Sequence, residues 1–157
     1  MSGSYTTVLV GTDGSESSYR AVDRAAKVAG DAGATLLLLT AYRPMSAREA
    51  QDARDALGDE AYKVSGSTPA EDVLRDAADR ARSAGATKVD TVAVEGDPVD
   101  ALISAVDKHG VDLIVVGNRG LNSLAGRLLG SVPANISHKA SCDVLIVHTT
   151  GKGVKSP

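Results

Sequence analysis

Five short apolar runs alternate along this chain with stretches of helical periodicity, and this alternation constrains the fold more than any other feature. The second, fourth and fifth runs are nearly continuous in Leu, Ile and Val, which is typical of strands covered on both faces. Strands that alternate with helices predict a parallel sheet, with right-handed crossovers placing helices on both faces. We therefore predict a three-layer α/β fold. Its expected strands are Thr7–Val10, Thr35–Ala41, Lys88–Val94, Asp112–Val116 and Asp143–His148.

Three of the intervening segments place apolar residues on one face of a helix. Asp97 followed by Pro98 predicts the start of the third helix, with Asp97 as its N-cap, and Gly110 predicts its end. The segments Ala32–Thr35 and Ala84–Thr87 have the same four residues, and each is expected to end a helix and open a strand, which indicates a weak internal repeat of one βα unit. The apolar stripes are Tyr19, Val22, Ala25, Ala26 and Ala29; Val73, Leu74, Ala77, Ala78 and Ala81; and Val99, Leu102, Ile103 and Val106.

The segment from Arg43 to Thr68 is too long for an ordinary connection in such a fold. Residues Arg48 to Leu57 within it have a composition that could form a helix. Excursions of this kind usually serve as a lid or an interface element, or are mobile.

Composition narrows the class of protein further. At 157 residues the chain is most simply one domain, which we place at residues 1–149, followed by a flexible tail at 150–157. Apolar residues make up 43% of the chain although Phe and Trp are absent, so the core must consist of Ala, Val, Leu and Ile. The net charge of −3 offers no electrostatic case for binding nucleic acid or an anionic membrane. No apolar stretch approaches the ~20 residues of a transmembrane helix.

The single cysteine, Cys142, excludes an internal disulfide, and the N-terminus lacks the pattern of a secretory signal. Both observations favour a cytoplasmic protein.

Glycines mark a candidate ligand-binding loop after the fourth strand. Gly117-Asn118-Arg119-Gly120 begins where this strand stops, and Gly130-Ser131 follows after nine residues. Glycine lets backbone amides approach a ligand that a side chain would hold away, and amides that converge at a helix start bind phosphate. Ser131 is a suitable N-cap for a helix from Val132 to Lys139, and Arg119 could pair with phosphate oxygens. The alternative is that these glycines form an ordinary turn.

A second loop, Gly11-Thr12-Asp13-Gly14-Ser15, follows the first strand. In the flavodoxin-like strand order 3-2-1-4-5, which we expect, the first and fourth strands are neighbours and ligands bind beyond their carboxyl ends. Asp13 could accept hydrogen bonds from a ribose or ligate Mg²⁺, or it could simply cap the turn before a helix that begins near Glu16. We expect Thr12 to contribute backbone contacts and Ala41, after the second strand, to line the adjoining wall.

Several familiar sites are missing. The chain has no P-loop and no dinucleotide-binding glycine motif after the first strand. Its three histidines lack metal-ligand spacing, and no nucleophile, base and orienting residue can be matched. Catalytic residues are therefore not assigned.

The two loops resemble those of the universal stress protein family. Its phosphate signature is Gly-x-x-Gly, nine residues, then Gly-Ser or Gly-Thr, and Gly117, Gly120, Gly130 and Ser131 match it. The start Val8–Ser15 and the ending Cys142–Val147 are similar to the family's opening turn and last strand, so the resemblance extends to about Thr149. It implies a Rossmann-like fold with five parallel strands, a homodimer joined through the last strands, and adenine-nucleotide binding.

By this resemblance, Asp13 lies by ribose, phosphates or Mg²⁺, and Ala41 offers backbone to the adenine edge. Two departures concern the ligand: Gly11 replaces a proline of some ATP-binding members, and Val132 replaces a second hydroxyl residue. The chain is also similar to single-domain actinobacterial members, some of which bind cyclic AMP, so ATP and cyclic AMP both remain candidate ligands. The expected nucleotide-binding residues are Gly11, Thr12, Asp13, Ala41, Gly117, Asn118, Arg119, Gly120, Gly130, Ser131 and Val132.

The resemblance thus predicts a nucleotide-binding regulatory protein of the stress response. A slow ATPase or phosphotransferase is one alternative, although the sequence lacks the general base or paired metal carboxylates that it needs. The other alternative is a dimeric interaction protein with a vestigial nucleotide site.

Overall fold

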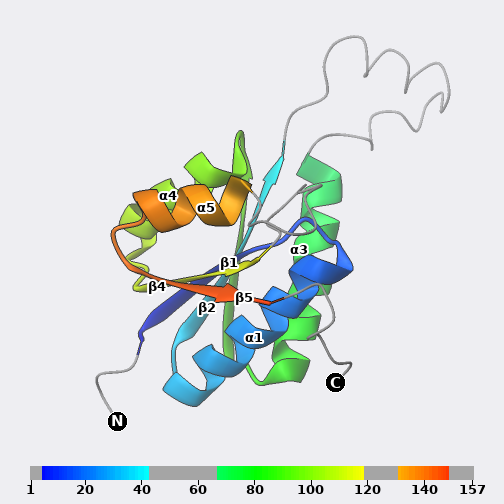
Figure 1. Cartoon of the computed structure of the whole chain (residues 1–157). Coiled ribbons are helices and arrows are strands. Elements are labelled where there is room, and N and C mark those ends of the chain that lie inside the picture. The colour runs from blue at the N-terminus through cyan, green and yellow to red at the C-terminus, as the bar shows by residue number, and fades with distance from the viewer. Residues whose placement is uncertain (1–4, 43–66, 119–130, 149–157) are drawn as a thin grey trace, which may run out of the picture.

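The computed structural model describes residues 5–42, 67–118 and 131–148, and it contains one parallel sheet with strands in the order β3-β2-β1-β4-β5 (Figure 1). The predicted α/β fold, its five parallel strands and their order are confirmed. The strands are β1 (Thr7–Gly11), β2 (Thr35–Tyr42), β3 (Lys88–Glu95), β4 (Leu113–Gly117) and β5 (Asp143–Val147). The helices are α1 (Glu16–Ala32), α3 (Ser67–Ala84), α4 (Pro98–His109) and α5 (Ser131–Lys139).

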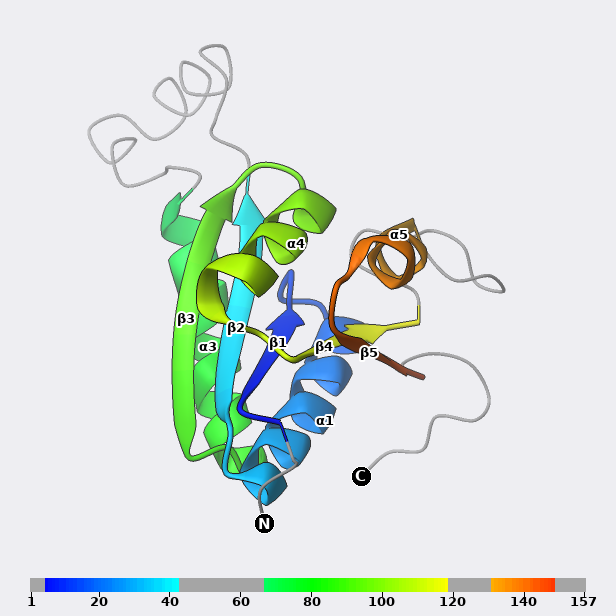
Figure 2. The same ribbon diagram turned by 90° about the vertical axis from the view of Figure 1, so that its left-hand side faces the viewer.

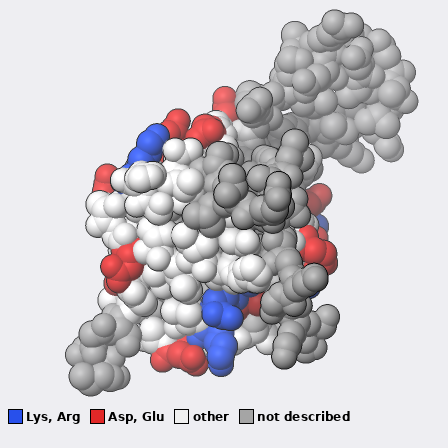
Figure 3. Space-filling view, in the orientation of Figure 1, with Lys and Arg blue, Asp and Glu red and all other residues white. Residues whose placement is uncertain are grey.

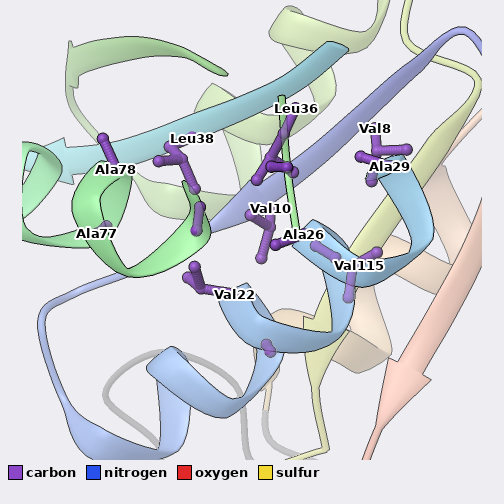
Figure 4. Packing of buried hydrophobic residues seen from close by; sticks show 14 of the residues in the cluster. Val8, Val10, Val22, Ala26, Ala29, Leu36, Leu38, Ala77, Ala78 and Val115 are labelled. Atoms are coloured by element: carbon purple, nitrogen blue, oxygen red, sulfur yellow. The ribbon is translucent and has the colours of Figure 1, made fainter. Parts of the chain in front are cut away.

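Helices cover both faces of the sheet, which gives the expected three layers (Figure 2). One buried cluster joins α1 and α3 to alternate residues of the strands. The intervening strand residues, which point to the other face of the sheet, form a second cluster with α4 and α5. Val8, Val10, Leu36 and Leu38 point toward α1 and α3, where they meet alanines such as Ala26 (Figure 4). Small helix residues therefore pack on larger strand residues, as a core without Phe and Trp requires.

The strand boundaries differ by one residue from those expected. The strands β1, β2 and β3 each continue one residue further, β4 runs from Leu113 to Gly117 rather than from Asp112 to Val116, and β5 ends at Val147 rather than His148. Apolar periodicity reports burial, whereas a strand ends where its backbone pairing ends. Gly11 and Gly117 are thus strand residues because they pair with Leu39 and Val147.

The repeated segment seen in the sequence forms the same helix end twice. Gly33 and Gly85 have φ angles of 70° and 125°. The next amide in each copy, that of Ala34 or Ala86, bonds to the carbonyl oxygen five residues earlier, at 2.8 and 3.1 Å. The second copy also lies close to α1, because a Cβ added to Gly30 would lie less than 3.0 Å from the carbonyl oxygen of Gly85. Glycine at position 30 allows α1 and the end of α3 to approach this closely.

Both caps of α4 follow their sequence signals. Asp97 caps α4 by accepting a hydrogen bond from the Asp100 amide at 3.1 Å, and Gly110 ends the helix with a φ of 65°. Both were predicted. No helix within the described ranges is long and apolar enough to cross a membrane. The helix expected at Arg48 to Leu57 and the tail expected at 150–157 lie outside these ranges.

Candidate functional site

The two candidate loops leave neighbouring strands at the same edge of the sheet. The strands β1 and β4 are parallel and adjacent, with Val10 opposite Val115. On its other side β1 pairs with β2, while β4 pairs with β5, so the chain order reverses between β1 and β4. The crevice beyond such a reversal point is where ligands bind in open α/β sheets.

The side chain of Thr12 does not face this crevice. Thr12 is fully buried, and its amide donates a hydrogen bond to the carbonyl oxygen of Leu39 at 2.9 Å. Its Oγ1 accepts a hydrogen bond from the Gly14 amide at 3.1 Å and lies 2.8 Å from Oγ of Ser18. The Thr12 amide is therefore already bonded to β2, and the expected backbone contact with a ligand stays a prediction for the Thr12 carbonyl.

Asp13 lies two residues beyond the carboxyl end of β1 and has an exposed side chain. Its Oδ1 accepts a hydrogen bond from the Ser15 amide at 2.9 Å, which closes the turn. The N-cap of α1 is Ser15, whose Oγ accepts a hydrogen bond from the Ser18 amide at 3.2 Å. The turn-capping interpretation of Asp13 is thus supported, and because that bond uses one carboxylate oxygen, a ligand role for the exposed carboxylate is compatible with it.

Ala41 lies within β2, opposite Val94, and the strand continues for one residue beyond it, to Tyr42. Along a parallel strand, the amide and carbonyl of successive residues point alternately to the two neighbouring strands. The carbonyl of Leu39 points to β1, where it accepts from Thr12, and that of Tyr42 points to β3, where it accepts from Gly96 at 2.8 Å. The backbone of Ala41 is therefore directed to the β1 side, past Gly11, the last β1 residue that pairs with β2.

The glycine motif is described only at its two ends. Gly117 is half-buried at the end of β4, and the half-buried Asn118 donates its amide hydrogen to the Val147 carbonyl at 2.8 Å. Neither Gly11 nor Gly117 has a positive φ, so the backbone at these two positions would accept other residues. Ser131 lies in the first turn of α5 rather than before it, and Val132 follows in the same helix. Arg119, Gly120 and Gly130 lie outside the described residues.

Ser18 is the residue of this region that sequence analysis missed. It is 5% exposed and bonds to Thr12 from the first turn of α1. Ser18 precedes Val22 and Ala25 by four and seven residues, so it continues an apolar helical stripe. A serine in such a stripe is the signal that could have indicated a buried hydrogen bond.

Three titratable groups with shifted pKa values, Tyr5, Asp112 and Cys142, lie at the opposite, amino-terminal end of the sheet. Burial raises the pKa of the Cys142 thiol, and the nearby Asp143 adds to this effect, so the thiol stays protonated. The hydrogen bond that Tyr5 donates to Asp143 at 2.7 Å raises the pKa of its hydroxyl. The described residues contain no group of three or more His, Cys, Asp and Glu that could hold a metal ion. Near the candidate site, the described residue Asp13 has an exposed carboxylate.

Asp112 at that amino-terminal end gives the fold a testable dependence on pH. Burial acts to raise the pKa of its carboxyl, but hydrogen bonds from the Thr6 amide (2.9 Å) and the Thr7 amide (3.0 Å) outweigh burial and lower it. A lowered pKa contributes stability above the unfolded-state pKa of about 3.9, and this stability is lost as pH falls through the folded-state pKa. We expect Asp112→Asn to be less stable than wild type at pH 7 and the difference to shrink below about pH 4.

Urea unfolding of both proteins between pH 7 and pH 2 measures this difference. Asp90→Asn is the control, because Asp90 is an exposed aspartate of β3. A constant difference between wild type and Asp112→Asn across this range would contradict the assignment.

Comparison with known proteins shows which family this chain is similar to. The sequence model of the universal stress protein family matches residues 4–148. Universal stress protein Rv1636 from Mycobacterium tuberculosis is 56% identical over 146 residues, which are 93% of this chain and 98% of that protein. A crystal structure of a universal stress protein in complex with cAMP is similar with a TM-score of 0.73 and 47% identity, covering 94% of this chain and 100% of the other. UspA from Lactobacillus plantarum, at 23% identity and a TM-score of 0.73 over 92% of this chain and 99% of its own, shares the fold.

Proposed function

Because the chain belongs to the universal stress protein family, we propose that it binds an adenine nucleotide at the carboxyl ends of β1, β2 and β4. The observation that carries this proposal is the universal stress protein with 47% identity, similar over its whole length, whose structure is a complex with cAMP. The crevice at the reversal point between β1 and β4 supports the location.

In the proposed complex, each part of the nucleotide meets a different strand end. The backbone of Ala41 is directed past the end of β1 and would contact the adenine edge. Asp13, exposed beyond the end of β1, would accept hydrogen bonds from the ribose. Gly117 would admit the phosphate, with its neighbours Gly11 and Asn118 at the same edge of the sheet. The amides at the start of α5 supply the charge complementarity, since the amino-terminal end of a helix favours anions.

Cyclic AMP and ATP make different demands on this site. Cyclic AMP carries a single phosphate on a compact ring and needs few donors, which suits a site with Val132 in place of a second hydroxyl residue. ATP would bring Mg²⁺, which proteins usually hold through carboxylate ligands. Two described carboxylates follow soon after β1 in the sequence, those of Asp13 and Glu16. Asp13 lies on the turn after β1, so we propose that it contacts the Mg²⁺. We propose that both nucleotides bind and that Mg²⁺ affects only ATP.

We further propose that the protein acts as a cytoplasmic homodimer in the stress response, joined through β5. This strand is an edge of the sheet, and edge strands with apolar side chains need to be covered. Ile146 is 36% exposed, and on the face that Figure 3 shows, uncharged side chains occupy the middle while most charged ones lie around them. A hollow of about 470 Å³ beside β5 is lined by Tyr5, Val28, Leu113, Asp143, Val144 and Leu145. Sedimentation equilibrium of the purified protein measures the proposed dimer.

Calorimetric titration of nucleotide-free protein with cyclic AMP, ATP, ADP and AMP, each with and without Mg²⁺, tests the proposed function. We expect saturable binding of cyclic AMP and ATP, and a melting temperature that rises with ligand concentration, because a ligand that binds only the folded state stabilises it. Cyclic GMP and GTP are the controls for recognition of the base. If no adenine nucleotide at millimolar concentration gives either a heat of binding or a shift in melting temperature, the proposal is refuted.

A further inference from the structure

Two hydroxyl groups are buried together beneath the turn that carries Asp13. Thr12 is 0% and Ser18 is 5% exposed, and their side-chain oxygens lie 2.8 Å apart. A buried hydroxyl costs free energy unless it is hydrogen-bonded. The partners of these two groups therefore determine what the pair can do.

The direction of each hydrogen bond follows from chemistry. Oγ of Ser18 lies 2.9 Å from the carbonyl oxygen of Ser15, which can only accept, so the Ser18 hydroxyl donates its hydrogen there. Thr12 must then be the donor in the bond between the two hydroxyls. Oγ1 of Thr12 in turn accepts from the Gly14 amide at 3.1 Å. One continuous chain of hydrogen bonds thus runs from the Gly14 amide through Thr12 and Ser18 to the Ser15 carbonyl.

This chain begins and ends on the backbone of the turn that carries Asp13. Gly14, which follows Asp13, has a φ of 84°, and a Cβ on it would lie 3.2 Å from Val73 of α3. The Ser15 amide holds Oδ1 of Asp13 at 2.9 Å. The two buried hydroxyls therefore hold the turn from below while Asp13 is held at its surface.

We propose that Thr12 and Ser18 are positioning residues of the nucleotide site: their hydrogen-bond chain holds the β1–α1 turn in the conformation that directs Asp13 toward the ribose. This inference rests on the proposed function. The two residues act without touching the ligand, since both hydroxyls are buried and have their single hydrogens committed to the chain. The inference concerns the Thr12 side chain, whereas the contact expected from the sequence was one of the Thr12 backbone.

Three variants separate positioning from general stability. Thr12→Val keeps the shape of the side chain and removes its hydroxyl, Thr12→Ser keeps the hydroxyl, and Val8→Ala removes core contacts on the same strand far from the turn. Thr12→Val removes both hydrogen bonds of Oγ1, and we expect it to weaken cyclic AMP and ATP binding by about tenfold in calorimetry, which corresponds to about 1.4 kcal/mol. Thr12→Ser should restore binding, and Val8→Ala should lower the melting temperature without changing affinity.

Hydrogen exchange of the ligand-free proteins provides a readout that needs no nucleotide. The Gly14 amide should exchange faster in Thr12→Val than in wild type and Thr12→Ser, because its acceptor is gone. Unchanged affinity in Thr12→Val, or an equal loss in Val8→Ala, would overturn the positioning role while leaving the proposed function standing. A wild type that binds no adenine nucleotide would instead overturn the proposed function, and the positioning role with it.

Discussion

Gly117→Ala should weaken the binding of cyclic AMP and ATP by about ten- to a hundredfold and leave the fold intact. Gly117 closes β4 with a φ outside the left-handed region, so an alanine fits its backbone. A methyl group at the proposed phosphate position would have to be accommodated against the ligand, and overpacking of one such group costs about 1–3 kcal/mol. Calorimetry gives the affinity, and the melting temperature without ligand reports on the fold.

Gly110→Ala is the matched control for this variant. Gly110 ends α4 at the opposite edge of the sheet with a φ of 65° and has no atom within 4 Å of an added Cβ. The left-handed backbone alone should cost about 1–2 kcal/mol of stability, while nucleotide affinity stays at the wild-type value. The two variants are therefore expected to have opposite effects: Gly117→Ala loses nucleotide affinity but keeps its stability, and Gly110→Ala loses stability but keeps its affinity. Wild-type affinity in Gly117→Ala would show that the phosphate lies elsewhere.

Gly30→Ala should destabilise the protein by about 2 kcal/mol, although the same change inside a helix ordinarily stabilises it by about 0.5–1 kcal/mol. An added Cβ would meet the carbonyl oxygen of Gly85, and because that atom belongs to the backbone it cannot rotate away. Either α1 or the end of α3 would have to move, which disturbs the alanine packing around Ala26 and Ala77. Urea unfolding measures the change in the free energy of unfolding.

The sign of the effect distinguishes the close contact from helix propensity. An increase in stability would show that α1 and α3 can separate at little cost. Gly33→Ala provides the scale, because Gly33 has a left-handed φ of 70° but no atom within 4 Å of an added Cβ. We expect its loss to be the backbone strain alone, about 1–2 kcal/mol, and to leave the packing of α1 on α3 unchanged.

The amino-acid sequence allowed more to be predicted for some residues of the candidate site than for others. Asp13 could be located from its place after a strand, and the two interpretations of its carboxylate proved compatible, since one oxygen closes the turn and the side chain is exposed. The buried contact of the Thr12 side chain could not be predicted, because its rotamer depends on where Ser18 lies when α1 packs against the sheet. Ala41 was expected to be the last residue of its strand, but β2 continues to Tyr42, since apolar character does not report where backbone pairing ends.

The amino-acid sequence by itself determined the α/β class, the five strands and the helix ends at Gly33, Gly85 and Gly110. These features depend on apolar periodicity and on the backbone freedom of glycine, which are local properties. Only the tertiary structure decided that Thr12 turns inward to Ser18 and that Gly30 of α1 meets Gly85. Both depend on how closely α1 packs on the sheet and on α3, and that distance results from contacts between residues that are far apart in the chain.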